Sequence, residues 1–281
     1  MVIVAALSGC GSKRSADSRT GLETLDAVLA PAAQAAALAD LGGAHFHATA
    51  TFRVEPLAKD PSADGTVPAS PPTITTTTDL WLDRLGNFRL VESNDQDGGR
   101  EIIRVGKEVA VALRYGKMVR RAAQDTESSR FLVEALGAPW AVWEVVRRQV
   151  EVDGGTAGGY RVKLSRRAVA WPPGFPAVVG LRKWRESAEV KTLEGRATVG
   201  PDGRTLIAFA CKASFQAIRD AVPVEGDMSV TSSLDQVGSV AAIVMPSVDG
   251  LHPRQRTILE ERALLGGLGA AISSAGKKAA P

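Results

Sequence analysis

The sequence predicts an α+β fold in which a strongly curved antiparallel sheet, a half-open β-barrel, carries helices that plug its concave face. Three observations predict this fold. Residues 45–54 alternate strictly between apolar and polar side chains, as in a half-buried antiparallel strand. Short strand patterns with closely spaced turns follow between residues 73 and 121, which indicates a curved meander. Two helical segments between residues 125 and 150 then interrupt the strands before strand patterns resume.

The segment before the first strand predicts a helix over residues 21–41. Leu22 and Leu25 begin a series of leucines at helical spacing. Pro31 lacks the N–H that a helix interior needs, so we expect it to kink or split this helix. Gly42 and the glycine after it then end the helix.

The remaining elements follow from alternation, caps and turn residues. The first inserted helix is opened by Asp125 or Thr126, and the second begins at Pro139. Residues 169–185 are rich in Pro and Trp and are expected to be irregular. We expect strands at residues 45–54, 73–82, 88–92, 100–105, 107–113, 115–121, 160–164, 188–199, 204–215, 227–234 and 239–245. We assign residues 21–250 to one half-barrel domain, and residues 251–281 to a C-terminal helix and a disordered tail.

Composition and motifs exclude several function classes. The net charge of +3 is too weak to argue for nucleic acid as a partner. No nucleophile elbow, zinc-protease motif or phosphate-binding loop occurs, so we do not expect an enzyme. His45 and His47 lie on one face of a strand at a spacing that could hold a metal, but no further ligand is indicated, so we expect no metal. Cys211 lies in an apolar strand and is expected to be a buried thiol.

A basic stretch runs through the expected meander. Between residues 100 and 121 there are seven basic residues against two glutamates. It could touch anionic lipid headgroups. We favour the alternative, a solvated outer face of the sheet.

The N-terminus carries a short motif, Leu7-Ser8-Gly9-Cys10, after an apolar run and before a polar stretch. This motif resembles the lipobox of a bacterial lipoprotein signal peptide. The resemblance implies that residues 1–9 are removed and that Cys10 is lipidated, with residues 10–20 forming a lipidated, flexible tether. A signal peptide normally begins with a basic segment, and none precedes Cys10, so we expect the leader to be truncated at its start.

The order of elements resembles the LolA/LolB-like and LppX/LprG-like lipid- and lipoprotein-carrier proteins of the bacterial envelope. The resemblance covers most of residues 21–246 and includes the closing segment Ala242-Ile243-Val244-Met245-Pro246. It implies a half-open barrel whose cavity, between sheet and helices, holds acyl chains. By analogy, we expect Trp140 and Trp143 to form the plug. The expected wall consists of Phe46, Phe52, Leu80, Leu82, Ile207, Phe209 and Phe215.

Two function hypotheses follow. The first is a membrane-anchored, non-enzymatic lipoprotein that binds a lipid or lipidated protein in an apolar cavity, with no cofactor beyond the acyl anchor. The alternative is a structural or protein-interaction lipoprotein of the envelope without a ligand cavity, in which Trp171, Phe175 and Trp184 are exposed anchors. Gly11 replaces the aspartate that retains lipoproteins in the inner membrane, so the family's rule favours the outer membrane, with a periplasmic domain.

Overall fold

The computed structural model describes residues 13–57, 73–122, 125–154, 158–169, 187–219 and 222–247. Several sequence predictions therefore lie outside the described residues. These are the leader with Cys10, most of the loop between the first two strands, the irregular segment with its three aromatic anchors, and the C-terminal helix and tail.

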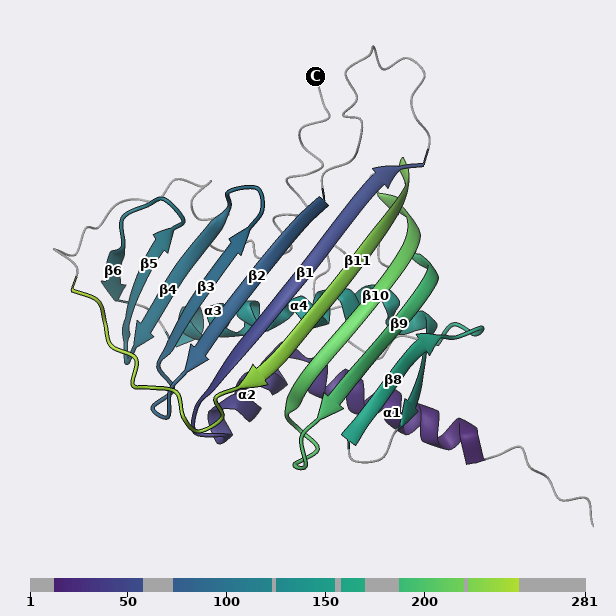
Figure 1. Ribbon diagram of the computed structural model, residues 1–281, viewed down its shortest axis with the longest axis horizontal. Coiled ribbons are helices and arrows are strands. Elements are labelled where there is room, and N and C mark those ends of the chain that lie inside the picture. The colour runs from purple at the N-terminus through teal and green to yellow at the C-terminus, as the bar shows by residue number, and fades with distance from the viewer. Residues whose placement is uncertain are drawn as a thin grey trace, which may run out of the picture.

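One antiparallel sheet of eleven strands forms the body of the molecule (Figure 1). Its strands are β1 (Ala44–Pro56), β2 (Thr73–Leu82), β3 (Phe88–Asn94), β4 (Gly99–Val105), β5 (Glu108–Leu113), β6 (Val119–Ala122), β7 (Val150–Gly154), β8 (Gly159–Leu164), β9 (Glu189–Val199), β10 (Leu206–Arg219) and β11 (Val222–Asp235). They lie side by side in the order β6-β5-β4-β3-β2-β1-β11-β10-β9-β8-β7. Because β1 and β11 pair at the centre, the first and last strands of the chain join two meanders.

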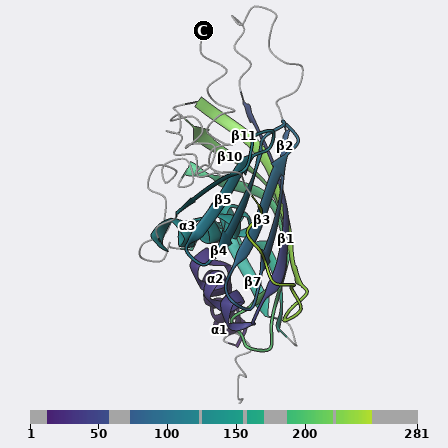
Figure 2. The ribbon, with the colours of Figure 1, turned by 90° about the vertical axis from the view of Figure 1, so that its left-hand side faces the viewer.

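The helices all lie on one side of this sheet, which we term the concave face (Figures 1 and 2). They are α1 (Lys13–Leu29), α2 (Pro31–Asp40), α3 (Asp125–Ala135) and α4 (Gly137–Val146), followed by a 3-10 turn, Arg147–Gln149. Helix α4 contacts β1, β10 and β11, and α1 contacts β7. The predicted curved antiparallel sheet with helices on one face is confirmed at this level, and the sheet does not close into a barrel.

The alternation predicted for β1 appears directly in its burial. Phe46, Ala48 and Ala50 are buried on the concave face, while the residues between them are partly exposed on the opposite, outer face. Two register shifts between β9 and β10, at Leu206 and at Phe215, bend this part of the sheet. The predicted helix break is also confirmed, because Pro31 begins α2 and Ala30 before it is extended.

Three sequence predictions need correction. Residues 239–245, predicted as a strand, have no regular structure. The N–H of Ile243 donates to the carboxylate of Asp83 instead of to a neighbouring strand. The segment 236–247, the strap, runs from β11 past the lower strand ends towards β6 (Figure 1).

The other two corrections concern the helices. Helix α4 ends at Val146, and Val150, which we placed in this helix, opens β7, which pairs with β8. Helix α1 begins at Lys13, so it extends into the segment that we expected to be a flexible tether. No helix in the described ranges is long and apolar enough to cross a membrane.

Candidate functional site

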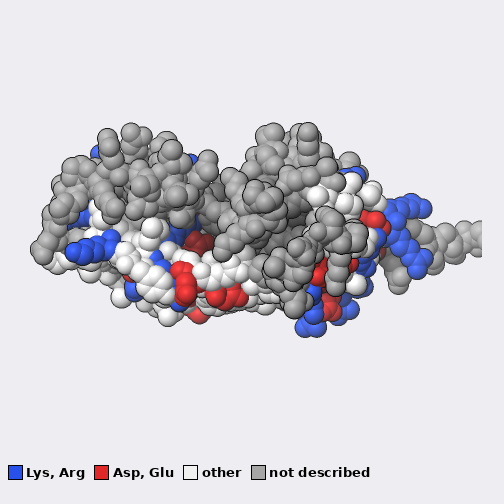
Figure 3. All heavy atoms as spheres, turned by 90° about the horizontal axis from the view of Figure 1, so that it is seen from above, with Lys and Arg blue, Asp and Glu red and all other residues white. Residues whose placement is uncertain are grey.

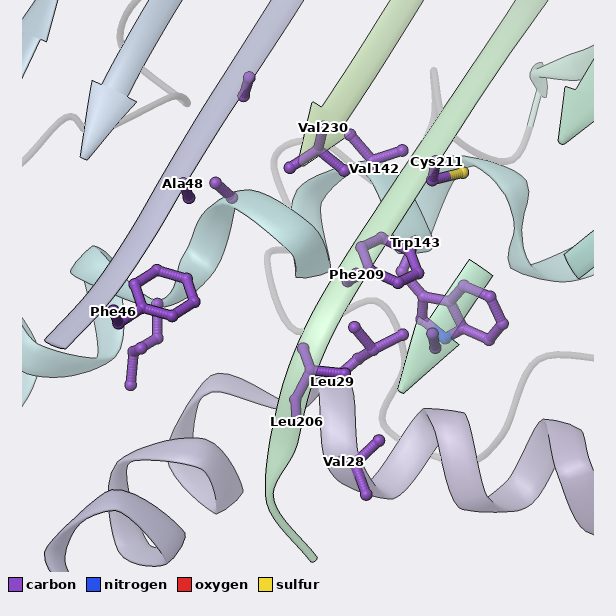
Figure 4. Close-up of a cluster of buried hydrophobic side chains, with 14 of the residues drawn as sticks. Val28, Leu29, Phe46, Ala48, Val142, Trp143, Leu206, Phe209, Cys211 and Val230 are labelled. Atoms are coloured by element: carbon purple, nitrogen blue, oxygen red, sulfur yellow. The ribbon is translucent and has the colours of Figure 1, made fainter. Parts of the chain in front are cut away.

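The nine side chains predicted to line a cavity meet in one apolar cluster between the sheet and the helices. Six of them, Phe46, Leu80, Leu82, Trp143, Phe209 and Phe215, are fully buried there. Phe52, Trp140 and Ile207 are partly buried and pack against the same cluster. Figure 4 shows Trp143 beside Phe209, with Phe46 further along the concave face. The structure therefore brings the predicted residues together.

An ion pair fixes the plug helix against α1. The indole N–H of Trp143 donates to Asp26 Oδ1 at 2.8 Å, and Arg147 Nη2 lies 2.7 Å from Asp26 Oδ2. Arg147 is buried, so removing either partner would leave an uncompensated charge in the interior. Sequence reasoning missed this pair. The available signal was Asp26 within the run of leucines on α1.

Small and polar side chains occupy the middle of the concave face. Ala48 and Ala50 of β1 are flanked by Thr76 and Thr78 of β2 and by Ser232 of β11, and all five are buried. Figure 4 shows Val142 of α4 beside Val230 of β11, and α4 also contacts β1. Large residues at these positions would hold the helix away from the sheet, so their size determines how closely the two layers approach.

A polar row crosses this apolar face from one side to the other. The strand register aligns Arg100 of β4, Glu92 of β3, Thr78 of β2, Ala48 of β1 and Ser232 of β11. Nε of Arg100 donates to Glu92 Oε2 at 2.5 Å. Two atoms of the row, Nη2 of Arg100 and Oγ of Ser232, are buried and have no hydrogen-bond partner within the described part of the chain.

Arg100 also connects the sheet to α3. Its Nη1 lies 3.4 Å from Oε2 of Glu134, a residue that also accepts a hydrogen bond from Arg130 at 2.8 Å. Burial raises the pKa of the Glu134 carboxyl, and the two arginines only partly offset this effect. The partly buried charge of Glu134 is therefore costly and depends on both Arg130 and Arg100.

The basic stretch between residues 100 and 121 does not form one surface. Arg100 is buried on the concave face, which neither sequence interpretation anticipated. Arg104 donates to the carbonyl oxygen of Gly106, and Arg114 to that of Asn94. Arg120 pairs with Glu108 on the outer face. Pairing within the sheet thus occupies most of the charges that we assigned to a solvated face.

On the outer face, the two histidines form a charged cluster. Asp79 Oδ1 lies 3.0 Å from His45 Nε2 and 2.8 Å from His47 Nδ1, while Asp235 Oδ1 lies 2.9 Å from His45 Nδ1. Trp81 stacks on the His45 ring at 4.7 Å. Because the two carboxylates approach opposite sides of His45, these groups do not face a common point. No group of His, Cys, Asp and Glu in the described ranges could hold a metal ion.

The thiol of Cys211 lies in the interior, as predicted from its strand. It is buried beside Phe209, and burial raises its pKa to about 12. Such a thiol is almost entirely protonated at neutral pH, so it acts as a small apolar side chain and not as a nucleophile.

No protein-family model matches this chain, and no curated protein matches it. Among solved structures, it is similar to a β-barrel-like protein of domain of unknown function DUF1849 from Brucella abortus. The TM-score is 0.19 at 11% identity, over 69% of this chain and 96% of that chain. It is also similar to the MucA/MucB complex of Pseudomonas aeruginosa, with a TM-score of 0.17 at 10% identity, over 78% of this chain and 95% of that chain. A structure of MucB in complex with MucA(peri) gives a TM-score of 0.15 at 12% identity, over 75% and 94% of the two chains. TM-scores this low support no conclusion about the fold or function of this chain, which rest on its own residues.

Proposed function

We propose that this protein binds an amphiphile, an apolar chain with a polar group, between the concave face of its sheet and its helices. In this proposal it is a non-enzymatic lipoprotein, anchored through Cys10, whose ligand is a lipid or the lipid part of a lipidated protein. Its domain faces the periplasm, from the outer membrane. The fully packed alternative, a structural or interaction lipoprotein, remains the outcome against which the proposal is tested.

The observation that carries the proposal is the polar row with its two unpartnered atoms. Almost all buried polar atoms in proteins have a hydrogen-bond partner, and leaving one unmade costs about 1–3 kcal/mol. Here Nη2 of Arg100 and Oγ of Ser232 have no partner among the described residues, and both lie on one row of the concave face, four strand spacings apart. The polar group of an amphiphile would supply a partner to one of these atoms while its apolar chain contacts the surrounding cluster.

The surrounding side chains suit an acyl chain. The cluster is made of aliphatic and aromatic residues and includes Phe46, Phe209 and Met228. Each methylene moved from water into such surroundings contributes about 0.8 kcal/mol. Because side chains such as Ala50 are short, the helices approach the sheet closely in the middle of the concave face. An acyl chain bound there would take the place of helix side chains, while the side chains of the sheet would stay in position.

Binding requires the helix layer to separate from the sheet, because the lining residues are buried. The attachments differ between helices: α4 contacts three strands, whereas α3 contacts mainly α2 and α4. The Arg100–Glu134 pair connects α3 to β4, and Phe131 of α3 is buried. Helix α3 is therefore the part of the layer that we propose to move when a ligand is admitted.

The test uses the full chain with Cys10→Ser, titrated with a fluorescent long-chain fatty acid. Ala50→Leu places a larger side chain in the middle of the concave face, and we expect the probe to bind at least tenfold more weakly. The matched control is Thr49→Leu, the neighbouring residue on the outer face, which should bind as the parent does.

Circular dichroism and thermal unfolding establish that each variant is folded. A folded Ala50→Leu variant that binds the probe as tightly as the parent would contradict the proposal. So would a parent that binds no probe, and that outcome would favour the packed alternative. Ser232→Ala provides a second test, because it removes one unpartnered hydroxyl with little change in volume. It should weaken binding of the fatty acid while leaving the folded protein at least as stable.

A further inference from the structure

One end of the molecule combines exposed basic residues with an exposed leucine. It consists of β7, β8, the residues that follow β8, and the first turns of α1 (Figure 1). Figure 3 shows blue side chains gathered at this right-hand end, with a few red ones among them. We term the surface formed by Arg161, Lys163, Leu164, Arg166 and Arg167 the basic end. All five residues are exposed.

The charges of the basic end are only partly neutralised by the protein. Lys163 pairs with Asp153 across β7 and β8. Arg161 stands opposite Arg196 of β9 and opposite Asp153 of β7, and Lys163 stands between Glu151 of β7 and Glu194 of β9. The excess positive charge of the basic end therefore comes from Arg166 and Arg167, which follow β8 and are exposed.

An exposed apolar side chain ends β8, on the face of the sheet opposite to Lys163. Leu164 closes β8 between Lys163 and the two arginines that follow, and it is 37% exposed. The N–H of Ser165 donates to Gln149 O at 2.8 Å, and the N–H of Val169 donates to Arg148 O, so the chain after β8 is held against the 3-10 turn. An exposed leucine flanked by bases is the pattern of a surface that dips into the headgroup region of a bilayer.

The position of α1 brings its first residues to this same end. A Cβ placed on Gly21 would lie 2.9 Å from Val152 Cγ1, so the middle of α1 rests closely on β7. From there the helix runs outwards to Lys13, past the edge of the sheet (Figure 1). Cys10 precedes Lys13 by three residues. Any anchor on Cys10 therefore holds this end close to a membrane.

We propose that the basic end is a membrane-contact surface that binds anionic lipid headgroups and orients the domain with the edge strand β7 and its neighbour β8 towards the bilayer. The proposal rests on the proposed function only for the anchor on Cys10, which sets where the membrane lies. Bases next to an anionic bilayer attract it within about one Debye length, and this attraction weakens as salt is added.

The experiment measures binding of the unlipidated full chain, Cys10→Ser, to vesicles of phosphatidylglycerol and phosphatidylcholine, and to vesicles of phosphatidylcholine alone. The test variant combines Arg161→Gln, Arg166→Gln and Arg167→Gln. The control combines Arg84→Gln, Lys107→Gln and Lys117→Gln, three exposed bases on the β2 to β6 side, so the net charge of the two variants is equal.

We expect the parent to bind only the anionic vesicles, more weakly at high salt. The test variant should lose about 100-fold in partitioning, since each base near the surface contributes about 1 kcal/mol, and the control much less. Equal losses in the two variants, or equal binding to both kinds of vesicle, would overturn the proposal. Leu164→Ser in the parent should weaken binding severalfold without changing its salt dependence.

The anchor is measured separately, by incorporation of labelled fatty acid into the unmodified chain in bacteria. Labelling of Cys10 without binding to anionic vesicles would contradict the proposed membrane-contact surface and support the proposed anchor. Binding to anionic vesicles without labelling would contradict the anchor and support the membrane-contact surface.

Discussion

The two faces of the central strands differ in chemistry although they are built from alternate residues of the same chain. On the concave face of β1 lie Phe46, Ala48 and Ala50, all buried beneath helices. On the outer face of the same strand, Thr49 and the two histidines are partly exposed and contact polar neighbours. A shift of one residue in register would exchange these two sets, so burial of the concave set fixes the register.

This difference between the two faces shows which polar side chains need a specific explanation. Most polar side chains on the outer face have water available, although Nε of Arg120, whose Nη2 pairs with Glu108 there, is also buried without a partner among the described residues. Arg100 and Ser232 lie on the concave face, and their atoms that lack a partner among the described residues are the reason for expecting an amphiphilic ligand. The following predictions compare substitutions on the two faces, in decreasing order of expected effect.

Neighbouring residues of β10 should respond very differently to truncation. Phe209→Ala removes a ring that is 1% exposed, so we expect a loss of about 3–5 kcal/mol in the free energy of unfolding. Lys212→Ala, on the outer face, should change it by less than about 0.5 kcal/mol. Chemical denaturation measures both. Similar losses in the two variants would mean that the concave face is not the core.

The buried arginine should matter more than an exposed one. Arg100→Ala leaves Glu92 and Glu134 without their shared partner, and we expect a loss of about 3 kcal/mol in unfolding free energy. Arg89→Ala, whose partner Glu101 lies on the outer face, should cost less than about 1 kcal/mol. A small loss for Arg100→Ala would show that α3 is not held by this pair.

Close approach of two strands should make one glycine irreplaceable. A Cβ on Gly226 of β11 would lie 2.6 Å from Arg53 O and from Phe215 Cζ, so Gly226→Ala should cost about 1–3 kcal/mol. Gly154→Ala in β7 meets no atom within 4 Å and should be close to neutral. Thermal unfolding of both variants decides the matter, and a tolerated Gly226→Ala would indicate looser contact at the Phe215 ring.

The smallest effect is expected at the boundary between the faces, where Asp83 holds the strap. Burial alone would raise the pKa of Asp83, but hydrogen bonds from Ile243 N, Asn87 and Leu85 together lower it below the usual value. A lowered pKa means that this stabilisation is present above the ordinary Asp value and is lost as the pH falls through the folded-state value. The protection factor of the Ile243 amide, its intrinsic exchange rate at a given pH divided by its measured rate, should therefore fall on acidification, and in Asp83→Asn it should be low at every pH. A protection factor at Ile243 that does not change with pH in the parent would contradict this account.

Much of the sheet was predictable from sequence, because apolar and polar residues alternate along a strand wherever one face of the sheet is exposed to water. The bounds of β2, Thr73–Leu82, match the prediction, and Pro31 separates two helices as expected. The strap was predicted as a strand because Ile243 and its neighbours are β-formers. No residue near Ile243 in the sequence indicates that its backbone N–H donates to the carboxylate of Asp83 instead of to a neighbouring strand.

The polar row could not be predicted because it depends on pairing between distant segments. Ile102 and Ile103 are both apolar, so alternation did not reveal which face Arg100 occupies. Ser232 becomes unusual only once β11 is paired with β1, far away in sequence. That these nine apolar residues meet in one cluster was predictable from alternation and from the helix pattern, since burial alone brings such side chains together.

The most direct test of the central claim is native mass spectrometry of the full Cys10→Ser chain, expressed in a bacterium and purified without detergent. We predict bound masses spaced by acyl methylenes, strongly reduced in a folded Ala50→Leu variant and retained in Thr49→Leu. A parent that carries no bound mass, and stays free of ligand after incubation with phospholipid and fatty acid, would contradict ligand binding at the concave face.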